Sequence, residues 1–359
     1  MKLNYKFFSL KRIYIHFCLL ALLNIFFSTT ITNAQTFSIN DVEISTPFEI
    51  NFDKNEIVDQ GFKEAFDRLV LSIVQTQDQE KLNQISLSII KGMIEKFSIK
   101  EEKFIDEIYH LNLNVSFNKK KVFSLLEKKN IFPSLLIRQN IFFIPIIFDE
   151  DKNEMSIFSK NFLFDKWNKN KRQYHLLNYV LPIGDLDDLN LIKSKSSNLE
   201  NYDFKEIISK YNLEDYVVMI VYKNNNDVRV FSKIFFRGTM SLKNYRFQSL
   251  KIENNNQHMK FIKRIKNDLE DHWKSKNQMN TSIKLPIFVS IKNDNNSKIF
   301  SFENTIKNLD FLHDFNIFKF DNKKNVYKII FNGSPDNFLD MMKKNNYEFD
   351  TQNRIWSVK

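Results

Sequence analysis

The chain has 359 residues and a formal net charge of +10, from 53 Lys and Arg against 43 Asp and Glu, and it contains 37 Phe, 5 Gly and 1 Cys. A single cysteine excludes a disulfide-stapled scaffold, and isolated glycines exclude the clustered-glycine loops that bind dinucleotides and nucleotide phosphates. The length is too great for one ordinary core, so we expect two or three domains.

The first 34 residues have the layout of a secretory signal peptide. A basic region with Lys2 and Arg12 precedes an apolar run at 13–27, and small residues surround a cleavage point near Ala34. The run has about 15 residues, whereas a helix needs roughly 20 to cross a bilayer. We therefore expect an exported, periplasmic protein whose mature chain has no transmembrane span and has lost Cys18, its only thiol.

Residues 35–138 are expected to form an N-terminal ferredoxin-like module. Apolar residues at helical spacing follow Asp53, which can cap the helix that they predict. The order β-α-β-β-α, with a candidate closing strand, is that of a split βαβ fold. The other predicted elements are strand 37–44, helix 79–90, strands 93–99 and 105–117 joined by a charged turn at 100–103, helix 119–129 and closing strand 131–136.

Residues 139–280 are expected to form a central α/β domain. The runs 141–148 and 216–222 are almost wholly apolar, which is typical of strands covered on both faces. Strands that alternate with helices predict a mixed, partly parallel sheet, and later strands add antiparallel edges. The remaining elements are helices 162–167, 187–192, 204–211 and 257–273, and strands 179–181, 228–236 and 245–252.

Residues 281–359 are expected to form a second ferredoxin-like module. Residues 329–349 resemble 115–132 in their strand-turn-helix pattern, so the two terminal modules are interpreted as related. The predicted fold class is therefore α/β and α+β, with a central mixed sheet between two split βαβ modules. The C-terminal elements are strand 285–291, helix 302–312, strands 315–320 and 326–331, helix 335–344 and strand 354–358.

Three carboxylates, Asp185, Asp187 and Asp188, gather in the segment LPIGDLDDLN (181–190), between a short strand and a helix. Ligands bind at the carboxyl ends of strands in open α/β sheets, and oxygen ligands suit Mg²⁺ or Ca²⁺. A structural interpretation is simpler: Asp185 caps the helix, and Asp187 and Asp188 occupy its first turn. We favour the cap, because it explains every acidic position with one mechanism, and keep the metal site as the alternative.

Other polar residues give weaker signals. His175 and His272 lie near aromatic-rich segments but have no local second ligand, so structural roles are expected. Arg229, Arg237 and Arg246 recur in predicted strands and could line an anion site, although outward-facing arginines need no function.

Two basic clusters, 119–121 and 263–266, lie on predicted helices opposite their apolar faces. Solvated lysines are ordinary at such positions, and an exported protein meets little nucleic acid, so no nucleic-acid partner is expected.

The chain resembles a family of exported proteobacterial proteins catalogued as domain of unknown function 2066, over about residues 35–274. The resemblance is carried by strand 37–44, the small and apolar positions of the first helix, the apolar strand with Pro145 and the helix that ends near Trp273. Pro182, Asp185 and Asp188 of LPIGDLDD are its most specific positions. The family implies an envelope location and no established activity, and it supplies no catalytic residue.

We expect a non-enzymatic binding or assembly factor of the bacterial cell envelope. Its partner would be an envelope protein or an anionic cell-wall or lipid component, and no cofactor is predicted. The alternative is a divalent-metal hydrolase that acts on an envelope polymer or phosphoester at Asp185, Asp187 and Asp188. An oligomeric state is not predicted.

Overall fold

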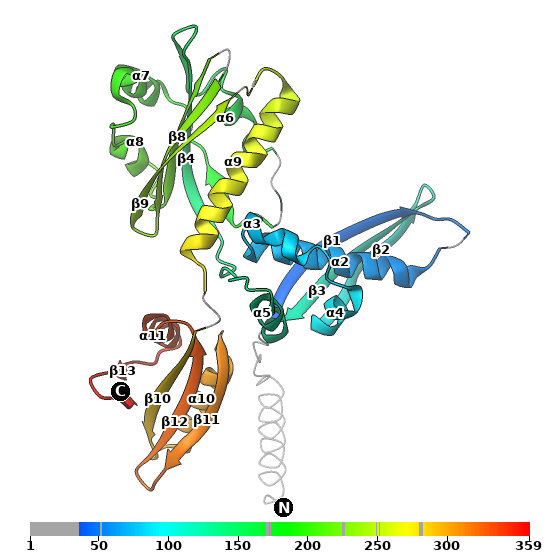
Figure 1. The fold of residues 1–359 in the computed structure, drawn as a ribbon, viewed down its shortest axis with the longest axis vertical. Helices are drawn as coiled ribbons and strands as arrows, with labels where there is room; N and C mark the ends of the chain where they lie inside the picture. Colours follow the sequence, from blue (N-terminus) through cyan, green and yellow to red (C-terminus); the bar gives the residue numbers. More distant parts are fainter. Residues whose placement is uncertain are drawn as a thin grey trace, which may run out of the picture.

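The computed structural model describes residues 36–50, 52–169, 172, 174–224, 227–248, 250, 252–279, 283–309 and 311–359. The predicted signal peptide lies outside these residues. The described chain combines three sheets with parallel and antiparallel pairing and helices packed on them, so it has the expected α/β and α+β class (Figure 1). None of the helices described is both long enough and apolar enough to cross a membrane.

The N-terminal module is an antiparallel sheet of order β1-β3-β2 with helices on one face. Asp53 caps α2, as predicted, by accepting the N–H of Asn55, and the apolar stripe of α2 is buried against the sheet. The elements are β1 (Thr36–Pro47), α2 (Lys54–Ile73), α3 (Thr76–Gln79), η1 (Glu80–Leu82), α4 (Leu87–Met93), β2 (Ile94–Ile105), β3 (Ile108–Asn118) and α5 (Lys119–Lys128).

Three predictions for this module are wrong. The helix expected at 79–90 is broken, because Ser86 caps a new helix, α4. The charged turn expected at 100–103 is part of β2, and the hairpin instead turns at Asp106 and Glu107, both with positive φ. The closing strand expected at 131–136 does not form, since the segment crosses to the next domain.

The central sheet has the order β5-β4-β7-β8-β9, and β6 also pairs with β4. Strand β4 is parallel to β6 and β7, whereas β5, β8 and β9 add antiparallel pairs, as the sequence predicts. Alternate residues of β4 enter two cores, one with α9 and one with α7 and α8. The elements are β4 (Gln139–Asp149), β5 (Glu154–Ser156), α6 (Phe162–Lys166), β6 (Leu177–Val180), α7 (Leu186–Ser194), η2 (Ser196–Asn198), α8 (Lys205–Ser209), β7 (Tyr216–Lys223), β8 (Asp227–Phe236), β9 (Thr239–Gln248) and α9 (Asn255–Lys276).

The C-terminal module has the sheet order β11-β12-β10-β14-β13. Strands β10, β11 and β12 are arranged as in a split βαβ, but β14 runs parallel to β10, because the short β13–β14 hairpin reverses the chain first. The elements are β10 (Lys284–Lys292), α10 (Asn296–Lys307), β11 (Leu312–Phe320), β12 (Lys324–Asn332), α11 (Pro335–Lys344), β13 (Phe349–Asp350) and β14 (Trp356–Val358).

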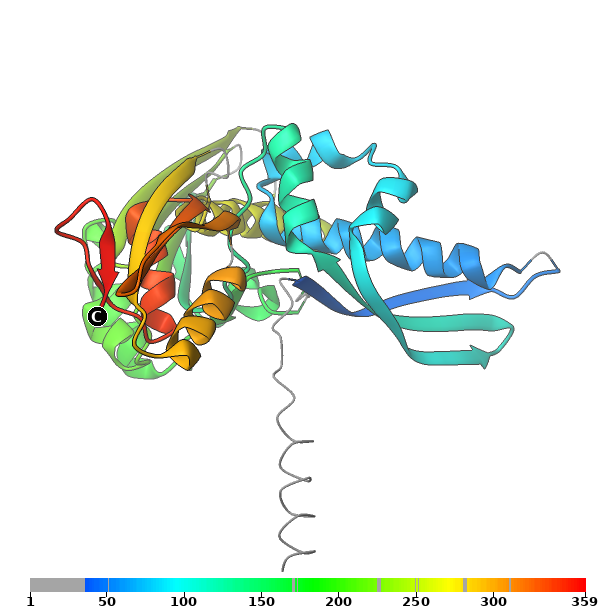
Figure 2. The same ribbon diagram turned by 90° about the horizontal axis from the view of Figure 1, so that it is seen from below.

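The C-terminal end of α9 joins the N-terminal and central parts of the chain. Lys274 Nζ donates to the carbonyl oxygens of Leu71 (2.6 Å) and Val74 (2.9 Å), where α2 ends. Trp273 Nε1 donates to Ile137 O at 2.8 Å, in the segment that leads into β4. From this junction the strands of the N-terminal module extend away from the central sheet, as Figures 1 and 2 both show.

Candidate functional site

The segment 181–190 is a helix cap held by a lysine. Asp185 accepts the N–H of Asp188 at 2.6 Å, and Lys210 from the end of α8 reaches both carboxylates, at 2.5 Å from Asp188 and 3.5 Å from Asp185. Asp188 is fully buried, whereas Asp187 lies exposed in the first turn of α7. The pKa of Lys210 is raised, chiefly by its hydrogen bond to Asp188.

The metal hypothesis for this segment gains no support from its surroundings. Within the described ranges, no three His, Cys, Asp or Glu side chains are grouped as a metal ion requires. A Mg²⁺ or Ca²⁺ ion at Asp185 and Asp188 would compete with the Lys210 ammonium, which already supplies a positive charge between them.

The two candidate histidines lie in different places. His175 lines a cavity beside α9, and the His272 ring lies 5.6 Å from that of Phe236. The pKa of each is lowered to about 4, first by burial and then by nearby lysines, so both rings are neutral at pH 7.

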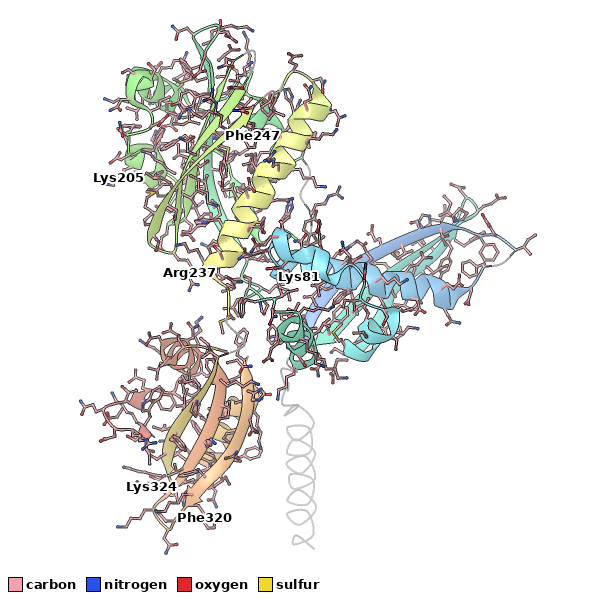
Figure 3. The ribbon with its side chains drawn as sticks, in the orientation of Figure 1. Lys81, Lys205, Arg237, Phe247, Phe320 and Lys324 are labelled. Atoms are coloured by element: carbon pink, nitrogen blue, oxygen red, sulfur yellow. The ribbon has the colours of Figure 1, made fainter. Side chains whose placement is uncertain are left out.

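The three candidate arginines do not gather into one anion site. Each contacts a different partner. The pairs are Arg229 with Glu200 at 2.8 Å, Arg246 with Asp227 at 2.7 Å, and Arg237 with Asn277 at 2.7 Å. Figure 3 shows Arg237 at the end of the central sheet near the C-terminus of α9.

Helix α9 buries three charged side chains at four-residue spacing: Lys266, Glu270 and Lys274. Lys266 Nζ donates to Trp167 O at 2.5 Å, and the Glu270 carboxylate accepts the backbone N–H groups of residues 176 and 177, each at 3.0 Å. Burial is the main cause of the raised pKa of Glu270 and of the lowered pKa of Lys274. The prediction that the whole cluster 263–266 is solvated is therefore wrong for Lys266.

A cavity of about 310 Å³ lies between α9 and the segment before β6; we call it the cationic cavity. Tyr174 separates it from a second cavity of about 280 Å³, which Arg68 and Arg138 also line. The cationic cavity thus combines several positive side chains with a few apolar ones. It is lined by Arg172, Tyr174, His175, Met259, Lys260, Ile262, Lys263 and Lys266.

Large apolar side chains are exposed where β1 and α2 meet the β2–β3 hairpin; we call the group Phe48, Ile50, Phe104, Ile105 and Ile108 the apolar tip. The Phe48 and Phe104 rings form a T-shaped pair with centroids 4.9 Å apart, so these two side chains pack on each other at the tip. Half or more of the Phe48, Phe104 and Ile105 surface is exposed, and Ile50 is fully exposed. The tip lies at the far end of the projecting strands (Figure 2).

Comparisons with known proteins assign no family to the chain. No family model matches it, and no curated protein is similar to it. Among solved structures, a crystal structure of an uncharacterised protein matches 39% of this chain and 91% of its own, at 9% sequence identity and a TM-score of 0.17. A likeness of this size carries no argument about function.

Sequence reasoning missed the cationic cavity and the apolar tip for different reasons. Lys260 and Lys263 adjoin Met259 and Ile262 in sequence, but only the fold brings the segment with Arg172 against them. The tip had a local signal, because apolar residues at 104, 105 and 108 stand among carboxylates, but this pattern was attributed to ordinary strands.

Proposed function

We propose that this protein is an exported, periplasmic, non-enzymatic factor that binds or helps assemble another component of the bacterial cell envelope. The observation that carries the proposal is the apolar tip. Its five large side chains are exposed at the end of a projecting hairpin, where Phe104 packs on Phe48 and Ile105 pairs with Ile108. Exposed apolar side chains grouped in this way are typical of an interaction surface.

The charges around the tip favour a protein partner over an anionic membrane. Carboxylates outnumber lysines among the described residues next to the tip. They are Glu49, Asp53, Glu101, Glu102, Asp106 and Glu107, against Lys54 and Lys103. Anionic lipid would repel this negative rim. A partner protein with an apolar cleft bordered by Lys or Arg would complement both the tip and its rim.

The proposed location rests on the sequence. The basic and apolar regions before Ala34 fit a signal peptide, and the resemblance to domain of unknown function 2066 implies the same compartment. Crosslinking in intact cells tests the location and the partner together.

A photo-crosslinking amino acid at position 105 should trap one periplasmic protein, and the same residue at position 320 should not. Phe320 is a matched control, because it is also an exposed large apolar residue at a hairpin end, in the C-terminal module (Figure 3). The trapped protein should then bind purified wild-type chain, and the double variant Phe104→Ser, Ile105→Ser should bind it at least about tenfold more weakly.

Because at least half of each side chain is exposed, the double variant should stay folded and lose only the Phe48–Phe104 ring contact. Trapping of the same proteins at 105 and 320, or unchanged affinity of the double variant, would contradict the proposal. Trapping of a second copy of this chain would identify self-assembly as the function of the tip. Turnover of phosphoester substrates by the purified protein with Mg²⁺ would instead favour the hydrolase alternative.

A further inference from the structure

Positive charge is concentrated at the cationic cavity. Lys260, Lys263 and Lys266 lie on one stretch of α9, and Arg172 faces them from the segment before β6. Lys266 forms the buried part of the wall, and its ammonium lies 5.4 Å from the centroid of the Trp167 ring.

The carboxylate nearest to this arrangement compensates only part of it. Glu270 lies one turn beyond Lys266 and interacts with it electrostatically, while its oxygens accept backbone N–H groups. Among the residues that the structure describes, no carboxylate pairs with Arg172, Lys260 or Lys263. The lowered pKa of His175, caused by burial and then by Lys266, Lys274 and Arg172, reflects the same excess of positive charge.

The shape and the remaining walls indicate what the cavity can hold. Its 310 Å³ is room for a group much larger than one water molecule, which occupies roughly 30 Å³ of liquid. Met259, Ile262 and the Tyr174 ring also line the cavity and supply apolar surface beside the charged groups. Several cations around one open cavity match a compact dianion better than a single carboxylate, because a phosphate accepts hydrogen bonds from several donors at once.

We propose that the cationic cavity binds a phosphate monoester group attached to a small body with an apolar face. Lys260 and Lys263 attract and hold the phosphate at the rim, Arg172 donates to it from the opposite wall, and Lys266 supplies positive charge from the buried side. The phosphate has two sources of the same chemistry, a free phosphorylated molecule or a lipid headgroup.

Calorimetric titration of the full mature protein with glycerol 3-phosphate, at constant ionic strength, tests the proposal. We expect saturable binding that weakens about tenfold or more in the variant Lys260→Gln, Lys263→Gln, because two charge-assisted hydrogen bonds to the phosphate are lost. The control Lys343→Gln, Lys344→Gln removes the same charge from exposed positions on α11 and should bind like the wild type.

Flotation with vesicles of phosphatidylcholine, with and without phosphatidic acid, distinguishes the two sources. Binding to glycerol 3-phosphate identifies a free ligand, and binding only to phosphatidic acid vesicles, lost in the Lys260 and Lys263 variant, identifies a headgroup. No binding to either probe, or equal binding by both lysine variants, would overturn the proposal. The tip variant Phe104→Ser, Ile105→Ser should keep phosphate binding, so this test and that of the proposed function fail separately.

Discussion

At the scale of single residues, buried charges determine the local structure. Asp188 is fully buried and depends on Lys210, which also reaches the Asp185 cap. A buried carboxylate without a partner is strongly unfavourable, so the lysine fixes the start of α7 against the end of α8. The presence of Asp185 and Asp188 in the LPIGDLDD segment is thereby explained by folding.

Alanine substitutions separate the cap from a metal site. Asp185→Ala should lower the free energy of unfolding by about 1 kcal/mol, because α7 loses its N-cap acceptor. Asp187→Ala, at an exposed position, should change it by less than about 0.5 kcal/mol. Urea denaturation measures both, and stabilisation by Mg²⁺ or Ca²⁺ that disappears in Asp187→Ala would contradict the capping interpretation.

At the scale of elements, close contact between α2 and its sheet depends on a glycine. A Cβ on Gly61 would lie 2.3 Å from Leu113 Cδ1, and Leu113 is fully buried in β3. Any residue other than glycine at position 61 would hold α2 farther from β3.

The same substitution at two glycines should have opposite effects. Gly61→Ala should destabilise the protein by about 1–3 kcal/mol, because overpacking against Leu113 outweighs the helix preference of alanine. Gly92→Ala, in α4, should stabilise it by about 0.5–1 kcal/mol, since the added methyl group would meet nothing outside its own helix turn within 4 Å. Chemical denaturation tests the pair, and stabilisation by both would show that α2 can move away from the sheet freely.

At the scale of the whole molecule, the end of α9 connects two cores. Lys274 is buried, and its ammonium donates to the carbonyls at the C-terminus of α2, where a positive charge also complements the helix dipole. The N-terminal module is therefore attached to the central domain through these Lys274 contacts, which lie at the end of the module away from the apolar tip.

Removal of this contact should weaken the coupling between the N-terminal and central cores. Lys274→Met should lower stability by about 2 kcal/mol, because the Leu71 carbonyl oxygen loses the donor that Lys274 supplies and Val74 O keeps only Gln79. Calorimetry should resolve two thermal transitions where the wild type has one. Lys276→Met, at an exposed position two residues later, is the control, and an unchanged single transition in Lys274→Met would show that the junction does not depend on this lysine.

Much of the fold could be predicted because its signals are local. The run 141–148 indicates a strand covered on both faces, and its residues do enter two cores. Helix 335–344 was predicted with its observed bounds, and the structure shows Ser334 as its cap and Pro335 in its first turn. The turn at 100–103 was wrong because β2 is an edge strand that is exposed from residue 95 to residue 105, and such a strand tolerates charges throughout.

The sequence by itself determined the mixed fold class, the cap at Asp185 and the covered strands of the central sheet, because periodicity and capping depend on neighbours within a few residues. The tertiary structure alone decided which lysines are buried, where segment 131–136 lies, and that Arg172 meets Lys260 and Lys263 at one cavity. These features depend on atoms far apart in the chain, and no local pattern specifies which of them will meet.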